Sequence, residues 1–291
     1  MKLLVATSFG LAATIALGEI PNPADAPQPL APAESRELFS VPDGFRIDLV
    51  AAEPLIRDPS CIAWGDGGRL FVTELHGYNL EGHLYITELN KGGELDTEIR
   101  RVRVGPEMKE EARRGQSGNL KLLRDVDGDG EMDEALTWAA DIPPAYGVVA
   151  AGRGVIVTAA PHIIYFEDTD GDDLPDLRET LYTGFTVGEM ERGINNPVWG
   201  YDGWIYASQG WGGGKISGPK LGREVEIGRT DFRFKADGSA IEPVSGSNHT
   251  FGMAFDEVGN RFLITTSTPA RYAVPLPFRY LRRNPHVATP D

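Results

Sequence analysis

Two acidic runs contain the side chains whose types and spacing best suit metal binding. The sequence DTDGDDLPDLRE occupies residues 168–179, and DVDGDGEMDE occupies residues 125–134. Ca²⁺ takes about six to eight oxygen ligands, and alternate positions of a tight loop direct carboxylates toward one centre. In the later run, positions 1, 3, 5, 9 and 12 of the calcium-loop pattern are acidic, and position 7 offers a backbone carbonyl. The predicted ligands of the later run are Asp168, Asp170, Asp172, Leu174, Asp176 and Glu179.

The earlier run fits the same pattern less completely. Gly130 stands at position 6, where the later run has Asp173, but Leu136 stands at position 12, so Glu134 would have to replace it. Aspartate and glycine are also good turn formers, so both runs could be plain polar turns. Closely spaced carboxylates repel one another unless a cation neutralises them, which favours a structural Ca²⁺. The predicted ligands of the earlier run are Asp125, Asp127, Asp129 and Asp133.

A recurrent hairpin must position these loops. Each copy has an apolar strand, a turn rich in glycine or aspartate, and a second strand rich in aromatic and β-branched residues. Equivalent positions are Trp64, Ala150, Trp199 and Phe255, so successive copies are 86, 49 and 56 residues apart. The last two spacings match one blade of a β-propeller. The four copies read CIAWGDGGRLFVTE, GVVAAGRGVIVTAA, NPVWGYDGWIYASQ and GMAFDEVGNRFLIT.

The predicted fold is therefore all-β, a β-propeller of the six-bladed type of which this chain carries about four N-terminal blades. Each acidic run is predicted to join two outer strands of a blade, and the best helical candidate is residues 106–115. A small hairpin cannot bury both of its faces alone, so neighbouring copies must pack around an axis. A β-sandwich with similar hairpins, or a small ring closed by the first strand, remains the alternative.

The N-terminal region has the pattern of an export signal followed by a linker. Residues 1–18 contain one lysine, an apolar run and small residues near a cleavage position. The apolar run is shorter than the roughly 20 residues that span a membrane, so an uncleaved anchor is the less favoured alternative. Residues 19–34 hold five prolines and predict a semi-rigid linker before a domain over residues 35–291. We expect a periplasmic or extracellular protein that touches a membrane only through an uncleaved signal.

The charge and the cysteine content exclude several classes of function. The formal net charge is −15, which repels the phosphates of nucleic acids and attracts cations. Cys61 is the single cysteine, so this chain has no intramolecular disulfide and no C-x-x-C-H haem attachment.

Several phrases of the sequence resemble a known family. The segment LFSVPDGFRIDLVAAEPLIRDPSCIAWGDGGRLFVTELHGYN, the DGDG loops, INNPVWGYDGWIYAS and DFRFKADGSAIEPVSGSNHTFGMAFDEVGNRF are similar to large secreted bacterial proteins called membrane-bound dehydrogenases. The propeller of that group is similar to soluble quinoprotein glucose and sorbosone dehydrogenases, and the likeness covers residues 38–290. The resemblance implies pyrroloquinoline quinone as cofactor, a sugar or alcohol as substrate, and a cytochrome c as possible electron acceptor.

The catalytic residues that the resemblance implies are not retained. The family's histidine base falls at Arg192, its orienting aspartate at Trp211, and its cofactor-stabilising arginine at Asn248. His249 lies one position from the last of these and is the imidazole best placed to substitute, although a shift of one residue reverses the face of a strand. Gln116 resembles a quinone-contacting position. The candidate catalytic residues are therefore His249, Arg192 and Asn248, with Trp211 and Gln116 for the cofactor.

Two functions follow as hypotheses. The first is an exported quinoprotein-type dehydrogenase that oxidises a hydroxyl or an aldose by hydride transfer to pyrroloquinoline quinone. The second is a non-catalytic propeller that binds a carbohydrate or a protein, which the loss of the family's residues favours. His76 and His162, at strand boundaries, are minor candidates for a role.

Overall fold

The computed structural model describes residues 30–77, 83–85, 101–103, 116–187, 193–210, 212–247 and 249–275, together with residues 280, 283 and 286. The chain is all-β: one short helix, α1 (Pro32–Glu37), precedes a series of antiparallel sheets. The prediction of an all-β fold is confirmed. None of the helices in these ranges is long and apolar enough to cross a membrane.

Four larger sheets follow one another along the chain. Sheet 1 contains, in order, β1 (Pro59–Trp64), β2 (Leu70–His76), β5 (Ser117–Arg124) and β6 (Glu134–Ile142). Sheet 3 contains β11 (Asn195–Trp199), β12 (Ile205–Ser208), β15 (Phe232–Phe234) and β16 (Ile241–Pro243). Sheet 4 contains β17 (Thr250–Phe255), β18 (Arg261–Thr265) and β19 (Arg271–Ala273). A short turn, η1 (Asp66–Gly68), joins β1 to β2, and β3 (His83–Tyr85) pairs separately with β4 (Arg101–Arg103).

Sheet 2 is larger because a hairpin from the next sheet extends it. Its own strands are β7 (Gly147–Ala151), β8 (Gly154–Ala159), β9 (His162–Glu167) and β10 (Leu177–Phe185). The connection between β12 and β15 of sheet 3 returns to it as β13 (Gly214–Ser217) and β14 (Val225–Ile227), with β13 paired to β10. The glycine-rich sequence GWGGGK at residues 210–215 is by itself typical of a flexible loop. That interpretation is wrong at its C-terminal end, because Gly214 and Lys215 belong to β13.

The four predicted hairpins are confirmed. They are β1–β2, β7–β8, β11–β12 and β17–β18, each antiparallel. Trp64, Trp199 and Phe255 end the first strand of their hairpins, and Ala150 stands one residue before the end of β7. Each hairpin forms from residues close in sequence, so the alternation of apolar residues and the glycine turns were sufficient to locate it.

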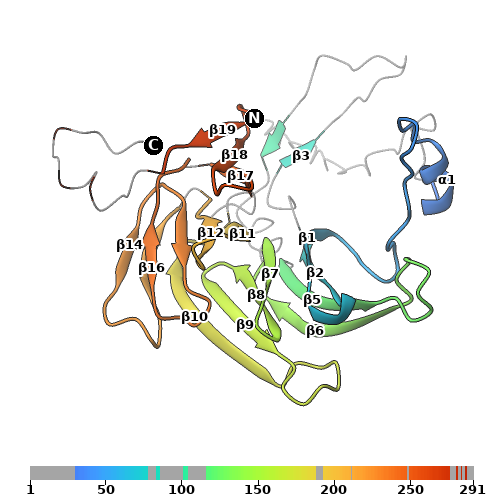
Figure 1. The fold of residues 1–291 in the computed structure, drawn as a ribbon, viewed down its shortest axis with the longest axis horizontal. Coiled ribbons are helices and arrows are strands. Elements are labelled where there is room, and N and C mark those ends of the chain that lie inside the picture. Colours follow the sequence, from blue (N-terminus) through green and yellow to red (C-terminus); the bar gives the residue numbers. More distant parts are fainter. Residues whose placement is uncertain are drawn as a thin grey trace, which may run out of the picture.

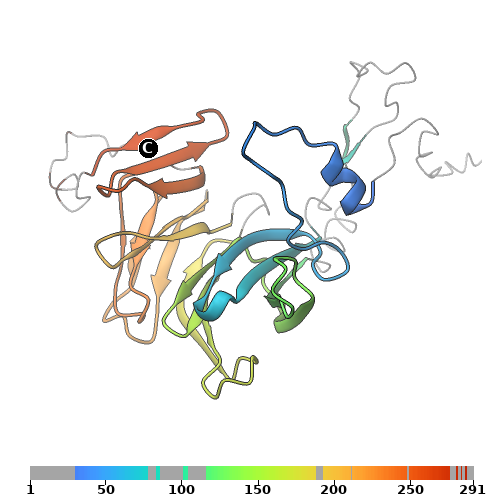
Figure 2. The same ribbon diagram turned by 45° about the vertical axis from the view of Figure 1, so that its right-hand side comes forward.

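The sheets are arranged around an arc, with the first strand of each on the inner side (Figure 1). Neighbouring first strands contact one another in chain order: β1 contacts β7, β7 contacts β11, and β11 contacts β17. Ser60 Oγ of β1 donates to the carbonyl of Ala145, just before β7, and Trp199 Nε1 of β11 donates to the carbonyl of Ala150 in β7, both at 2.7 Å. A second view shows sheet 1 and sheet 4 on either side of the opening of the arc (Figure 2).

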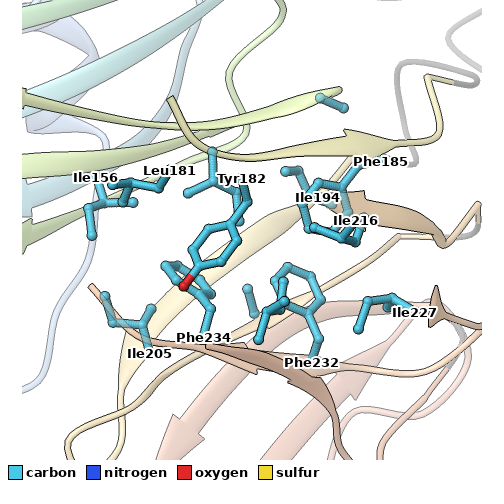
Figure 3. Close-up of a cluster of buried hydrophobic side chains, with 14 of the residues drawn as sticks. Ile156, Leu181, Tyr182, Phe185, Ile194, Ile205, Ile216, Ile227, Phe232 and Phe234 are labelled. Carbon is cyan, nitrogen blue, oxygen red and sulfur yellow. The ribbon is translucent and has the colours of Figure 1, made fainter. Parts of the chain in front are cut away.

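Apolar side chains fill the spaces between neighbouring sheets. Between sheets 2 and 3, the buried Tyr182 ring packs edge-on against Phe234, and Phe185 packs against Phe232 (Figure 3). On the face of sheet 1 that packs against sheet 2, the ring of Phe71 lies edge-on to that of Trp138. Sheets 1, 2 and 3 therefore bury apolar faces against one another in chain order.

Some predictions lie at the limits of the described residues. The predicted signal, residues 1–18, and the helical candidate, residues 106–115, lie outside them. The predicted linker, residues 19–34, lies outside them up to residue 29, and its last residues belong to α1, which begins at Pro32. A proline at the first positions of a helix is favourable because its missing N–H would be unpaired there anyway.

Candidate functional site

The two acidic runs form equivalent loops at the outer side of sheets 1 and 2. Residues 125–133 connect β5 to β6, and residues 168–176 connect β9 to β10, which are the third and fourth strands counted from the inner strand of each sheet. The prediction that each run joins two outer strands is confirmed. Both loops join outer strands and do not belong to the inner hairpins, so we expect a metal there to have a structural role.

The two loops have the same hydrogen-bond pattern. The carboxylate at position 1, Asp125 or Asp168, accepts backbone N–H groups from positions 4 and 6 at 2.6–3.0 Å. The carboxylate at position 9, Asp133 or Asp176, accepts the N–H of position 2 at 2.7 and 2.9 Å. Position 3 accepts from position 5, and position 5 from position 7. Each aspartate therefore folds its own loop, which a polar turn would also require.

Carboxylate oxygens gather within each loop. Oxygens of Asp125, Asp127 and Asp133 lie within 4.8 Å of one another in the first loop, as do those of Asp168, Asp170 and Asp172 in the second. Asp173, at position 6 of the second loop, adopts a φ of 66°, and Gly130 adopts 95° at the same position of the first. Aspartate tolerates this left-handed conformation better than most residues, which explains how it can replace the usual glycine.

Arginines already neutralise part of the second loop. Although burial opposes ionisation of the Asp168 carboxyl, N–H groups of Gly171, Asp173 and Asp172 hold its pKa below the usual value, and the charge of Arg69 adds to this. Arg153 Nη2 donates to the carbonyls of Asp168 and Thr169 at 3.0 and 2.7 Å. Arg69 and Arg153 therefore neutralise part of the negative charge of the second loop, which we had expected a bound cation to neutralise.

Four predicted ligands lie outside these carboxylate groups, as does the substitute Glu134; they are Asp129, Leu174, Asp176 and Glu179. Glu179 is in β10, where its carboxylate lies 3.2 Å from Lys220 Nζ, so the structure does not bring it to the loop. Glu134, the proposed substitute in the first loop, pairs with Arg124 at 3.2 Å. Asp129 accepts the N–H of Glu131 and Leu174 donates its N–H to Asp172, so both take part in folding their loops. The prediction that Glu179 or Glu134 supplies the ligand of position 12 in its loop is therefore wrong.

A second group of polar residues lies at one end of the inner hairpins. At this end the first strand of each hairpin begins and the second strand finishes, as shown by the pairs Gly147–Thr158, Asn195–Ser208 and Thr250–Thr265. We call it the inner polar end. Buried polar side chains are costly unless they have partners, so their accumulation here marks a place where polar contacts are needed. The buried members are Thr73, Glu74, Thr158, Asn195, Ser208, Gln209, Ser247, Thr250 and Thr265.

Glu74 organises the part of this end that belongs to sheet 1. Its side chain is 1% exposed, and one oxygen lies 2.7 Å from Lys121 Nζ and accepts the N–H of Arg57 at 2.8 Å. The other oxygen accepts from Asn119 Nδ2 and lies 3.1 Å from His76 Nε2. Burial opposes ionisation, but these hydrogen bonds from Lys121 and Asn119 lower the pKa of Glu74. The carboxylate therefore stays charged and holds the segment around Arg57 against sheet 1.

A buried ion pair joins sheets 3 and 4. Arg261 Nη1 lies 3.0 Å from Asp231 Oδ2, and both side chains are almost fully buried. Burial raises the pKa of Asp231 to about 6 in spite of the charge of Arg261 and the nearby Thr250 hydroxyl. The Arg261 guanidinium also bonds the Ser245 carbonyl and lies over the Tyr206 ring at 5.3 Å. Gly246 is required beside this pair, because a Cβ there would lie 2.1 Å from Asp231 Oδ2.

The structure brings two of the predicted catalytic and cofactor residues to the inner polar end. His249 is half-buried directly before β17, with its ring 4.5 Å from that of Phe251. Gln116 directly precedes Ser117, which pairs with His76 across β2 and β5. Arg192, Trp211 and Asn248 lie outside the described residues. His162 begins β9, away from the inner strands, and its Nδ1 lies 2.8 Å from Thr183 Oγ1.

Glu74 and Asp231 were not predicted. Glu74 is an isolated acidic residue within β2, and Asp231 directly precedes β15. Neither has a motif around it, so the burial of each depends on residues far away in the chain. Lys121 lies 47 positions beyond Glu74 and Arg261 lies 30 positions beyond Asp231, as their numbers show. A lone carboxylate in an apolar strand, as at Glu74 in LFVTELH, was the available signal, because such a residue is rarely buried without a partner.

A comparison with known protein families matches nearly the whole of the described part of the chain. Residues 31–291 match the family described as a domain of unknown function, DUF7133, and the chain therefore belongs to that family. No curated protein matches the chain.

Proposed function

We propose that the four sheets are consecutive blades of a β-propeller and that the inner polar end binds a small, neutral, polyhydroxylated ligand such as a sugar or a sugar alcohol. The observation that carries this proposal is the gathering of buried hydroxyl, amide and carboxylate side chains at one end of strands that contact each other in chain order. Convergent polar groups on the inner side of an array of sheets are the usual basis of a ligand site.

The charges favour a neutral ligand over an anionic one. Three cationic side chains described near this end, Lys121, Arg57 and Arg261, each pair with a carboxylate. With a net charge of −15, the surface also repels anions. Hydroxyl and amide groups both donate and accept hydrogen bonds, which suits a ligand that carries several hydroxyl groups.

Oxidation of such a ligand is the second candidate, favoured by the half-buried imidazole of His249 at the inner polar end. A histidine base takes the hydroxyl proton in this kind of reaction. Pyrroloquinoline quinone would supply the hydride acceptor, but it is a polyanion, and Lys121, Arg57 and Arg261 near this end are already paired with carboxylates. The described residues therefore do not fit that cofactor, and we derive no step through it.

The test is calorimetric titration of the protein with a panel of neutral monosaccharides and sugar alcohols. We expect at least one to bind, and His249→Gln to weaken its binding by tenfold or more. His162→Gln is the matched control, because it changes another half-buried histidine, in the third strand of sheet 2, and should leave the affinity unchanged. The same samples, given quinone and a redox dye, test the second candidate. Absence of binding across the panel, or equal losses in both variants, would contradict a site at the inner polar end.

A further inference from the structure

Asp58 and His76 lie next to each other in the sheet 1 part of the inner polar end. Asp58 directly precedes β1 and His76 ends β2, and Asp58 Oδ2 lies 3.4 Å from Nδ1 of the imidazole. The Asp58 side chain is 53% exposed, whereas that of His76 is 15% exposed. His249 directly precedes β17 as Asp58 directly precedes β1, so the two stand at equivalent places of their hairpins. The pair therefore belongs to the same end as the proposed ligand site.

The imidazole of His76 is held from the other side of its ring. Its Nε2 lies 3.1 Å from Glu74 Oε2 and 2.9 Å from Asn119 Nδ2. The Asn119 amide is itself oriented, because its nitrogen donates to Glu74 and its oxygen accepts the N–H of Asp141. Glu74 is buried and paired with Lys121. The ring cannot turn over without losing these contacts, so Nδ1 stays directed at Asp58.

Nδ1 of His76 carries a proton in this arrangement. The amide nitrogen of Asn119 can only donate, so in the neutral imidazole Nε2 accepts from it and the proton is on Nδ1. In a charged imidazole that donates from Nε2 to Glu74, Nδ1 carries a proton as well. A bare Nδ1 would instead place its lone pair against the Asp58 carboxylate. His76 therefore presents an N–H donor beside a carboxylate acceptor.

The backbone holds the Asp58 carboxylate at this place. Asp58 has a φ of 50°, in the left-handed region that few residues other than glycine adopt, and its carbonyl accepts the N–H of Leu75 at 2.9 Å. The N–H of the preceding residue, Arg57, donates to Glu74 Oε1 at 2.8 Å. Such conformations persist where surrounding contacts impose them, and they cluster at ligand sites. The turn therefore sets the carboxylate beside the imidazole before a ligand arrives.

The donor and the acceptor are incompletely satisfied by each other. Their separation of 3.4 Å exceeds the roughly 3.2 Å within which most N–H···O bonds lie. A hydroxyl group both accepts and donates, so it can take the N–H of His76 and give its own hydrogen to Asp58. An ammonium group would oppose the imidazole N–H, and a carboxylate would be repelled by Asp58. The pair is therefore suited to a hydroxyl group rather than to a charged one.

We propose that Asp58 and His76 form a subsite for one hydroxyl group of the ligand, whose oxygen accepts from His76 Nδ1 and whose hydrogen is donated to the Asp58 carboxylate. Glu74 and Asn119 are positioning residues, because they act through the imidazole. The inference rests on the proposed function, since it takes the ligand to be neutral and polyhydroxylated. It adds two contacts to that ligand and a reason to reject an amino or acidic group at one position.

The test is calorimetric titration of the full chain with D-glucose, D-galactose, D-mannose and sorbitol. Asp58→Gly and His76→Gln should each weaken the binding of the sugar that binds by about tenfold or more, as expected for a lost hydrogen bond to a charged or buried partner. Glycine adopts the φ of 50° without strain, so this variant removes the carboxylate alone. Glutamine is long enough to keep a polar contact with Glu74 in place of Nε2, but it has no counterpart of Nδ1.

Each variant has a matched control. Asp173→Gly also removes an aspartate that has a positive φ and pairs with an arginine, but it lies in the second acidic loop. His162→Gln removes an imidazole in β9, away from the inner strands. Both controls should bind like the wild-type protein. Unchanged circular dichroism and urea unfolding confirm that the variants fold.

Derivatives of the bound sugar that each lack one hydroxyl group identify the contact. One of them should bind the wild-type protein about tenfold or more weakly than the parent sugar does. The same derivative should bind Asp58→Gly about as well as the parent sugar does, because the partner of the missing hydroxyl is already gone. The derivative with an amino group at that position should bind the wild-type protein no better than the one that lacks the hydroxyl.

The possible failures of the two proposals are distinguishable. If no probe binds the wild-type protein, the proposed function fails and this subsite with it. If a probe binds and His249→Gln weakens it, but Asp58→Gly and His76→Gln bind like the wild-type protein, the subsite is wrong and the proposed function stands. If every deoxy derivative loses the same factor in the wild-type protein and in Asp58→Gly, Asp58 makes no contact with a hydroxyl group, and the subsite is again wrong.

Discussion

Arg124 joins sheet 1 to the second acidic loop, because its Nη1 donates to Asp173 Oδ2 at 2.9 Å. Arg124 ends the strand before the first loop, and Asp173 is the sixth residue of the second. Trp138 Nε1 donates to the carbonyl of the same aspartate at 2.9 Å, so its backbone also docks onto sheet 1. The second loop therefore contacts the outer strands of sheet 1 on either side of the first loop.

The first prediction concerns the conformation of Asp173. Asp173→Gly should change the free energy of unfolding by less than about 1 kcal/mol. The ion pair lost is partly exposed and contributes little, and glycine adopts the positive φ of 66° without strain. Asp173→Val should cost more than about 1 kcal/mol, because a β-branched residue is a poor fit to that conformation. Urea unfolding of the two variants measures the difference. Equal stabilities would show that the conformation at this position is relaxed.

The second prediction tests calcium. If the loops bind Ca²⁺ in the native state only, a chelator should lower the melting temperature and Ca²⁺ should restore it. At a hundredfold excess over Kd, such binding contributes about 2.7 kcal/mol. Asp170→Ala should remove much of the response, because Asp170 belongs to the carboxylate group of the second loop and its one hydrogen bond there is long, at 3.4 Å.

The control for calcium is Asp237→Ala. Asp237 is an acidic turn residue whose carboxylate accepts from Ser239, and it belongs to neither carboxylate group. This variant should keep the full response to Ca²⁺. Identical melting curves of the wild-type protein with chelator and with millimolar Ca²⁺ would end the calcium hypothesis and leave both loops as polar turns.

Sequence reasoning succeeded where structure is local. The hairpin that ends its first strand at Trp199 and the loop that begins at Asp168 both form from neighbouring residues, so turn chemistry and alternation were enough to locate them. The sequence did not predict that Lys215 would join sheet 2. Its strand, β13, pairs with β10, and both β11 and β12 lie between these two strands in the sequence. The assignment of Glu179 as a calcium ligand was wrong for a related reason. Glu179 stands at the correct position of the calcium-loop pattern, but its carboxylate pairs with Lys220, which is distant in the sequence.

The candidate site was predictable only in part. The proximity of His249 and Gln116 to the inner hairpins follows from the repeat, because segments next to equivalent strands come to the same end. The burial of the Asp231 carboxylate does not follow from the repeat, since its partner Arg261 belongs to the next sheet. Such pairs are set by the packing of one sheet on another, which no local pattern encodes.

The third prediction concerns the packing of sheet 2 on sheet 3. The Tyr182 hydroxyl is 2.8 Å from the carbonyls of both Lys235 and Ala240, and its ring lies in the apolar cluster of Figure 3. Tyr182→Phe keeps the ring but leaves these carbonyls without this donor, so it should cost about 1–3 kcal/mol. Tyr165→Phe is the control, because that hydroxyl bonds the partly exposed carboxylate of Glu167 and should matter less. Equal costs in urea unfolding would show that the Tyr182 hydroxyl does not join the sheets.

The fourth prediction is a dependence of stability on pH that originates in Asp231. Burial raises its pKa to about 6 in the folded protein, whereas an unfolded aspartate titrates near 4. Between these values the folded state binds more protons than the unfolded state, so this group makes the protein less stable as the pH rises from about 4 to about 6. The loss should reach about 3 kcal/mol for a shift of about two units. Glu74, Asp168 and Asp176 have lowered pKa values. Their contribution to stability is lost as the pH falls, at pH values more acidic than this range.

Urea unfolding at several pH values between 4.5 and 7 measures this contribution as a difference between variants. Asp231→Asn alone would leave Arg261 buried without its carboxylate at a cost of about 3–5 kcal/mol, so the informative variant is Asp231→Asn combined with Arg261→Met. The double variant should lose the Asp231 part of the slope and be relatively more stable at pH 7 than at pH 5, compared with the wild-type protein. Asp237→Asn controls for removing an exposed carboxylate and should keep the slope of the wild-type protein. Parallel pH profiles of the wild-type protein and the double variant would show that Asp231 is ionised throughout this range, and that the ion pair with Arg261 outweighs the cost of its burial.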